Sequence, residues 1–325
     1  MNHHPSSIIH YPLSIVAFAG GVGGAKLADG LARYLPPENL TVIVNTGDDF
    51  EHWGLKICPD LDTVCYTLAG LANPDTGWGR AEETWQIYEN IRQLGGEVWF
   101  RLGDKDLATH IERTHRLKSG QPLSRVVREF CRAWGVGATI LPMTDQPVTT
   151  IVDTVEFGEL PFQEYFVHRR CEPTVKSFRF DGIETAQPAP GVMDAIHAAD
   201  AIVFCPSNPW VSIDPILRTL TLDPSPLKGE GKTVVAVSPI IGGQTVKGPA
   251  AKMFAELGIE PSALAVAKHY GASISGFVLD MVDAALADEV QKLGIRPLVV
   301  KTLMKTSEDR QHLAEDVLNF IEELV

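Results

Sequence analysis

Four aspartates stand near one another in the sequence and could hold a divalent metal ion. Asp48 and Asp49 follow an apolar run, and Asp60 and Asp62 begin a helical stretch. Mg²⁺ suits one or two carboxylates whose coordination is completed by substrate phosphate oxygens. Aspartates at a helix start also cap the helix, which stabilises it by about 0.5–2 kcal/mol, so one of the second pair could do only that. We expect a Mg²⁺ ligand among these four.

A glycine-rich segment, Gly20-Gly21-Val22-Gly23-Gly24-Ala25-Lys26, has the composition of a phosphate-binding loop. Glycines let the backbone approach a phosphate, amides at a helix start point toward it, and a lysine adds positive charge. The segment fits neither standard fingerprint: Lys26 replaces the third glycine of a dinucleotide-binding motif, and Leu27 replaces the Ser/Thr of a Walker A loop. The alternative is a tight strand-to-helix turn with a solvated lysine. We predict phosphate binding by Gly20, Gly21, Gly23, Gly24 and Lys26.

A parallel sheet must position these residues. Apolar runs typical of buried parallel strands occur at 14–19, 40–45, 201–205 and 233–237. A helix is predicted at 25–34 and a polar loop at 46–54. In such a sheet, ligands bind beyond the carboxyl ends of the strands. Loops rich in glycine and small polar residues follow all four predicted strands, so we expect them to meet at one edge. Beyond the glycine-rich segment, these loops contribute Asn45, Ser207, Asn208, Ser238, Gly242 and Gly243 to the predicted site.

The order of the elements predicts a Rossmann-like α/β fold, with a parallel sheet and helices on both faces. Residues 148–181 alternate in polarity and are rich in β-branched and aromatic side chains, which predicts a small antiparallel β insert with 162–169 as one of its extended segments. The nucleotide-binding core then comprises 13–147 and 182–325, preceded by a disordered leader at 1–12. Segment 222–232 is rich in Pro and Gly and is expected to be a surface loop.

Further candidate residues lie at 78–110. Asp106 and His110 are four residues apart on one helix face, where they could form an acid–base pair or a metal site; a solvated or capping set is the commoner outcome. Arg101 is a better candidate for holding an anion or a carbonyl. Trp78 stands between glycines, so we expect a mobile aromatic lid over a flat ring, whereas Trp85 is expected in the core.

Composition excludes several classes of protein. A length of 325 residues with 45% apolar side chains supports one large domain or two closely joined ones. A net charge of −13 argues against binding to nucleic acid or to an anionic membrane. It is compatible with anionic small substrates, since fixed amides and a metal ion can reverse the local field. Five scattered cysteines indicate a reducing cytoplasm, and neither a membrane span nor a signal peptide is expected.

A series of motifs runs in order from residue 20 to beyond residue 300: GGVGGAK, NTGDD, CPDLDTV, GWGR, RLGDKDLATH, LPMTDQPV, PSNPWVSI, SPIIGGQTVKGPAAK and TLM. Together they resemble the 2-phospho-L-lactate transferase family of coenzyme F420 biosynthesis, and GWGR and GDD resemble its bacterial branch. The resemblance implies transfer of a phosphorylated three-carbon acid from a guanosine diphosphate-linked donor to the ribityl hydroxyl of Fo, a deazaflavin, with release of GMP. It also implies Mg²⁺ and a homodimer. The acid is 2-phospholactate in the archaeal branch, whereas phosphoenolpyruvate is the alternative for bacterial relatives.

The same resemblance implies roles for individual residues. Asp62 and Arg101 would contact Fo, with Trp78 as an aromatic neighbour of its ring. Asp49 and Asp60 would bind the metal, and either could act as base toward the ribityl hydroxyl. Asn45, Ser207, Asn208 and the 238–243 loop would hold the guanosine diphosphate. The candidate catalytic residues are therefore Asp49, Asp60, Asp62 and Lys26.

Two other classes of protein are kept open. Some relatives in the same fold family resemble regulatory proteins that bind UDP-sugars without catalysis. The acidic motifs and nearby Trp78 favour an enzyme, and UDP-sugar binding without Mg²⁺ dependence would reverse that preference. A nicotinamide dehydrogenase is disfavoured by Lys26 at the third glycine position and by Asn45 where an acid that binds ribose is expected.

Overall fold

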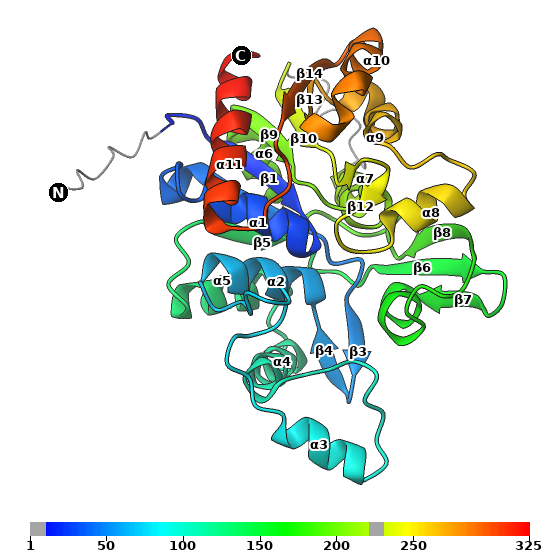
Figure 1. Cartoon of the computed structure of the whole chain (residues 1–325). Helices are drawn as coiled ribbons and strands as arrows, with labels where there is room; N and C mark the ends of the chain where they lie inside the picture. Colours follow the sequence, from blue (N-terminus) through cyan, green and yellow to red (C-terminus); the bar gives the residue numbers. More distant parts are fainter. Residues whose placement is uncertain (1–10, 221–230) are drawn as a thin grey trace, which may run out of the picture.

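The computed structural model describes residues 11–220 and 231–325, and its centre is a seven-stranded sheet (Figure 1). The strand order is β14-β13-β10-β9-β1-β2-β5, and all neighbouring strands are parallel. The strands are β1 (Ile15–Ala19), β2 (Leu40–Val44), β5 (Thr139–Pro142), β9 (Ala201–Phe204), β10 (Thr233–Val237), β13 (Gly276–Asp280) and β14 (Arg296–Val300). This arrangement confirms the predicted Rossmann-like fold, and its order reverses between β1 and β9.

Alternate residues of each central strand enter two separate hydrophobic cores. In β1, Val16 and Phe18 belong to one core, and Ile15, Ala17 and Ala19 to the other. Because both faces of the sheet are covered, its strands are apolar throughout, which is why they were recognisable as continuous runs.

Each core is completed by its own set of helices. One core includes side chains of α1 (Gly21–Leu31), α2 (Pro59–Leu68), α5 (Leu123–Ala133) and α11 (Ser307–Glu322). The other includes side chains of α6 (Val192–Ala198), α7 (Asp214–Leu220), α8 (Ala250–Glu256), α9 (Ala263–Tyr270) and α10 (Ala287–Lys292). Figure 1 shows α11 beside α1, so the last helix lies against the first.

The glycine-rich segment differs from its predicted form. It was expected as a turn before a helix at 25–34, but α1 already begins at Gly21. Gly20 is extended and Gly21 has a φ of 61°, a value that glycine adopts readily, so the chain turns within two residues. The remaining glycines therefore form the first turn of α1.

Two smaller lobes extend from the sheet (Figure 1). The first is the predicted insert, a three-stranded antiparallel sheet of β6 (Thr149–Thr154), β7 (Gly158–Pro161) and β8 (Val175–Asp181). The second contains the hairpin of β3 (Phe50–His52) and β4 (Leu55–Ile57), with α3 (Gln86–Gln93) and α4 (Asp104–Lys118). A two-stranded hairpin, β11 (Ile240–Ile241) and β12 (Gln244–Thr245), follows β10.

Two local predictions were wrong. Residues 46–54 were expected as a polar loop, but β3 and β4 pair there because Ile57 is buried among Leu102 and Leu107. Residues 162–169 were expected to be extended, yet Glu164–His168 forms a helical turn. That turn brings Phe162 and Phe166 together as a stacked pair with ring centroids 5.5 Å apart.

Some expectations lie outside the described residues. They concern the leader up to residue 10 and the loop at 222–230. Within 11–220 and 231–325, no helix combines the length and hydropathy that crossing a membrane would require.

Candidate functional site

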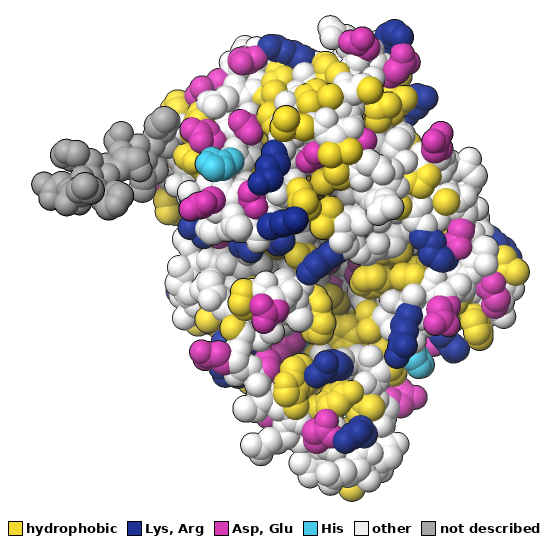
Figure 2. All heavy atoms as spheres, in the orientation of Figure 1, with side chains coloured by type: hydrophobic (Ala, Val, Ile, Leu, Met, Phe, Trp, Pro, Cys, Tyr) yellow, Lys and Arg dark blue, Asp and Glu magenta, His cyan; other side chains and the backbone are white. Residues whose placement is uncertain are grey.

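A cleft of about 620 Å³ opens beside the switch point between β1 and β9. Figure 2 shows a hollow in the middle of the molecule with hydrophobic side chains on its walls. The cleft is lined by many of the predicted residues: Gly20, Gly21, Gly23, Lys26, Asp48, Asp60, Asp62, Trp78, Arg101, Ser207, Asn208 and Ser238. Loops that are far apart in the sequence therefore meet at one edge of the sheet, as predicted.

Five predicted residues do not line the cleft: Gly24, Asn45, Asp49, Gly242 and Gly243. Some of them support its wall instead. The amide of Asn45 donates to Asp60 at 3.0 Å. A Cβ at Gly24 would lie 2.7 Å from the Ser207 hydroxyl, so only glycine allows that approach. The backbone N–H of Gly242 donates to the Asp283 carboxylate at 3.0 Å.

The polar side chains of the loops after β9 and β10 bind backbone groups. Ser207 Oγ accepts from the Gly20 N–H at 3.0 Å and donates to the Gly20 carbonyl at 2.9 Å. Asn208 Oδ1 accepts from the Trp210 N–H at 3.1 Å, and the Ser238 hydroxyl donates to the Ile240 carbonyl at 2.8 Å. These oxygens fix the loops, which leaves the first turn of α1 as the element suited to an anion.

Substituting Gly23 tests how closely the two loops at the switch point must approach. A Cβ at Gly23 would lie 2.2 Å from the Pro206 carbonyl oxygen, so we expect Gly23→Ala to lower the free energy of unfolding by about 1–3 kcal/mol, measured by urea denaturation. Gly137→Ala is the comparison, because Gly137 does not have a positive φ and its Cβ would meet only the Pro37 side chain, at 3.2 Å. A loss at Gly23 no larger than that at Gly137 would contradict a close contact with Pro206.

The four aspartates fall into two kinds of environment. Asp49 Oδ2 lies 3.2 Å from the Lys56 ammonium, and Asp62 forms a two-point ion pair with Arg113. Asp48 and Asp60 line the cleft, and within the described part of the chain no cationic side chain pairs with either. The structure therefore separates two neutralised carboxylates from two that have no counter-charge.

Burial opposes ionisation of the second pair. It raises the pKa of Asp60 to about 6, although hydrogen bonds from Asn45 and the Gly21 amide favour the charged form. Burial, followed by the negative charges of Asp60 and Asp49, raises the pKa of Asp48 well above its usual value. Two buried carboxylates that repel each other fit a divalent cation, which would supply the missing positive charge.

The pKa of Asp60 gives a testable pH dependence. A raised folded-state pKa stabilises the protein fully below the unfolded value of 3.8, and this contribution is lost as the pH rises through about 6. We therefore expect Asp60→Asn to gain stability relative to wild type as the pH rises from about 4 to about 6 in EDTA, with little further change above that, measured by urea unfolding. A difference between the two proteins that stays constant with pH would contradict this.

Arg113 is the centre of a buried polar network at the cleft wall. Its side chain is 2% exposed, and it contacts Asp62, the Lys56 carbonyl and His110 Nδ1. His110 Nε2 lies 3.3 Å from Asp106, whose pKa is held below its usual value by His110 despite burial. His110 and Asp106 are thus buried and in contact with each other, so of the alternatives given above the solvated one is wrong. Ligand atoms of Asp62, Asp106 and His110 lie within 4.8 Å of one another, but Arg113 already provides positive charge there.

The other part of the cleft is aromatic. Trp99 and Phe100 line it from the lobe containing α3 and α4, and Phe162 and Phe166 line it from the antiparallel insert. Trp78 also lines it and is 44% exposed. The four buried or half-buried rings were not predicted, because nothing in their local sequence shows that the two lobes face each other.

Arg101 and Trp85 interact with each other. The Arg101 guanidinium lies over the Trp85 ring, 4.3 Å from its centroid. Trp85 is therefore half-buried beside the site and not in the core as expected. Such stacking restricts the guanidinium while leaving its edge able to bind an anion or a carbonyl.

Fold and site together define a Rossmann-like protein with a ligand cleft at its switch point. Residues 15–323 match the family 2-phospho-L-lactate transferase CofD, and the chain belongs to that family. It is 44% identical to a phosphoenolpyruvate transferase of Streptomyces griseus over 96% of this chain and 99% of the relative. It is 39% identical to a 2-phospho-L-lactate transferase of Methanosarcina barkeri, over the same shares. The family and these names support transferase activity of the CofD type.

A solved structure shares the fold. It is a member of the UPF0052 family from Bacillus halodurans, with a TM-score of 0.59 and 17% identity, covering 94% of this chain and 99% of that one. At this identity the likeness concerns the fold alone.

Proposed function

We propose that this protein transfers a phosphoenolpyruvyl or 2-phospholactyl group from a guanosine diphosphate-linked donor to the ribityl hydroxyl of Fo, releasing GMP, in coenzyme F420 biosynthesis. One observation carries this proposal beyond the family match. A single cleft joins a glycine-rich helix start and two unpaired carboxylates to a wall of aromatic rings. The first part suits a diphosphate and the second suits a flat tricyclic acceptor. The homodimer and the cytoplasmic location stay predictions.

The residues of this cleft would act by positioning and charge stabilisation, with no covalent nucleophile. The first turn of α1 and Lys26 would hold the donor phosphates. Arg101 and the aromatic wall would orient the acceptor, so that its terminal hydroxyl meets the donor phosphorus. Asp62 would contact the acceptor from a fixed position, because Arg113 holds it.

We propose Asp48 and Asp60 as the Mg²⁺ ligands, in place of the expected pair Asp49 and Asp60. Asp49 is neutralised by Lys56 and does not line the cleft, whereas Asp48 does line it. Bound Mg²⁺ would offset the negative charge that accumulates on the donor phosphates. Asp60 accepts from Asn45 and the Gly21 amide, which support the charged carboxylate that a metal needs.

The test is to incubate the protein with Fo, Mg²⁺ and each of three guanylylated donors, carrying lactyl, enolpyruvyl or glyceryl acids. Product mass identifies the acid that is transferred, and an EDTA control tests the metal. We expect a Mg²⁺-dependent adduct with one donor. No adduct from folded protein would contradict the transferase proposal, and Mg²⁺-independent binding of a UDP-sugar would then favour the regulatory alternative.

A further inference from the structure

Lys247 is a cleft residue to which the sequence analysis gave no role. It lies between β12 and α8, and with Lys26 and Arg101 it is one of three lysine or arginine residues among the described residues lining the cleft. Four aspartates line the same cleft, so a lysine there that pairs with none of them calls for an explanation. In Figure 2, several Lys and Arg side chains, coloured dark blue, lie near the hollow.

Neither lysine is neutralised by a carboxylate. The Lys26 ammonium donates to the Met304 carbonyl at 2.7 Å, and the Lys247 ammonium donates to the Thr76 carbonyl. Within the described residues, neither forms an ion pair. Both charges are therefore held by neutral backbone oxygens, which a phosphate can replace with a stronger, charge-assisted bond.

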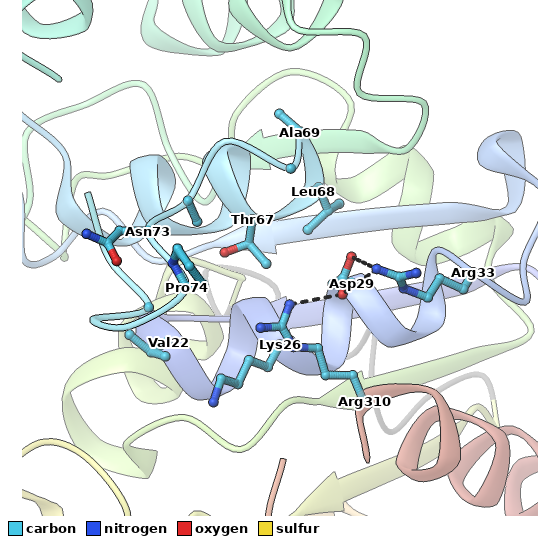
Figure 3. Close-up of a pocket in the computed structure, with 13 residues that line it drawn as sticks. Val22, Lys26, Asp29, Arg33, Thr67, Leu68, Ala69, Asn73, Pro74 and Arg310 are labelled. Carbon is cyan, nitrogen blue, oxygen red and sulfur yellow. Dashed lines mark hydrogen bonds and ion pairs between the residues drawn. The ribbon is translucent and has the colours of Figure 1, made fainter. Parts of the chain in front are cut away.

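The neighbouring arginines are different. Figure 3 shows a second pocket, of about 410 Å³, between α1 and the end of α2 with the loop after it, with Lys26 also on its wall. There Asp29 binds both Arg33 and Arg310, at 3.2 and 3.1 Å. Each arginine of that pocket therefore has a carboxylate partner, the shared Asp29, whereas among the described residues Lys26 and Lys247 form no ion pair.

The two ammonium groups are close enough to influence each other. Burial, followed by the positive charges of Arg310 and Lys247, lowers the pKa of Lys26. A Cβ at Gly77 would lie 2.7 Å from Val22 in the first turn of α1 and 3.4 Å from the Lys247 ammonium. Lys247 thus reaches the glycine-rich helix start from the opposite loop. Two ammonium groups that lie close together, neither of them in an ion pair among the described residues, are the arrangement expected where an anion binds.

We propose that Lys247 binds the donor diphosphate together with Lys26, so that ammonium groups from two loops close on one anion. This inference rests on the proposed function, because it takes the guanylylated compound as the ligand. The bond from Lys247 to Thr76 is then a resting contact that donor binding replaces. Thr76 belongs to the loop that carries Trp78, and its hydroxyl donates to the Trp78 carbonyl at 2.7 Å.

GDP is the probe for this proposal, with binding measured by calorimetry on the full-length protein. We expect Lys247→Met to weaken GDP binding about 10- to 100-fold, the usual effect of losing a hydrogen bond to a charged group. Lys247→Arg keeps the charge and is expected to recover most of the affinity. Lys292→Met removes the same charge from an exposed pair with Glu289 on α10 and should leave GDP binding unchanged.

Steady-state kinetics separate this role from a purely structural one. If Lys247 binds the donor, Lys247→Met raises the KM for the donor and leaves the KM for Fo unchanged. Unchanged GDP affinity, or a raised KM for Fo alone, would overturn the proposal and indicate that Lys247 only tethers the Thr76 loop. Wild-type protein that binds GDP without transferring a group would contradict the proposed function while leaving the binding comparison valid. Wild-type protein that does not bind GDP would overturn both.

Discussion

Arg113→Met is expected to lower the free energy of unfolding by about 3–5 kcal/mol, because it leaves the carboxylate of Asp62 buried without its cation. Arg113 is 2% exposed and binds Asp62 through both terminal nitrogens, so water cannot take its place. Urea denaturation with circular dichroism measures the loss. Arg113→Lys should lose less stability, since it keeps the charge but not the two-point geometry.

The double variant Asp62→Leu/Arg113→Met is the control for that interpretation. Replacing both partners by apolar side chains removes the unpaired charge, so most of the lost stability should return, although activity should not. A double variant as unstable as Arg113→Met would mean that the loss comes from packing or from the His110 and Lys56 contacts of Arg113.

Asp60→Asn and Asp48→Asn are each expected to reduce kcat by about 100- to 1,000-fold while the protein stays folded. Both carboxylates lie on the cleft wall without a counter-charge, so an amide at either position weakens the metal site that we propose. Transfer rates measured over a range of Mg²⁺ concentrations would show the weakening directly. Neither variant should be less stable than wild type in EDTA, because each removes one of two repelling carboxylates.

Asp49→Asn is the matched control among the four aspartates. It changes a carboxylate that is adjacent in sequence but paired with Lys56 and absent from the cleft wall. We expect a far smaller loss of kcat and an unchanged Mg²⁺ dependence. If Asp49→Asn instead lowers kcat as much as Asp60→Asn does, and Asp48→Asn keeps the wild-type kcat, the metal ligands are Asp49 and Asp60, as the sequence resemblance implied.

The sequence predicted the central sheet well because both faces of that sheet are buried. A strand such as β1 is apolar along its whole length, and the glycine-rich turn after it marks where the strand ends. The loops expected at one edge do meet there, since the carboxyl ends of parallel strands share an edge.

The division of labour among the aspartates could not be predicted in the same way. The four look equivalent in the sequence, and what distinguishes them is a partner that each one meets only in the fold. Arg113 stands 51 positions after Asp62 and belongs to a different helix. The aromatic wall was missed for a similar reason, because Trp99 and Phe162 come from separate lobes that only the tertiary structure brings face to face.

The contact between α1 and α11 has a consequence for synthesis of the protein. A Cβ at Gly30 would lie 2.2 Å from the Arg310 carbonyl, so the two helices cross with almost no space between their backbones. Asp29 and Arg310 are 281 positions apart. During translation, α1 is therefore made long before α11 and keeps an uncovered apolar side until α11 has left the ribosome. We expect ribosome-bound chains that lack α11 to be captured by chaperones, and emergence of α11 to be the event that first allows a competent cleft to form.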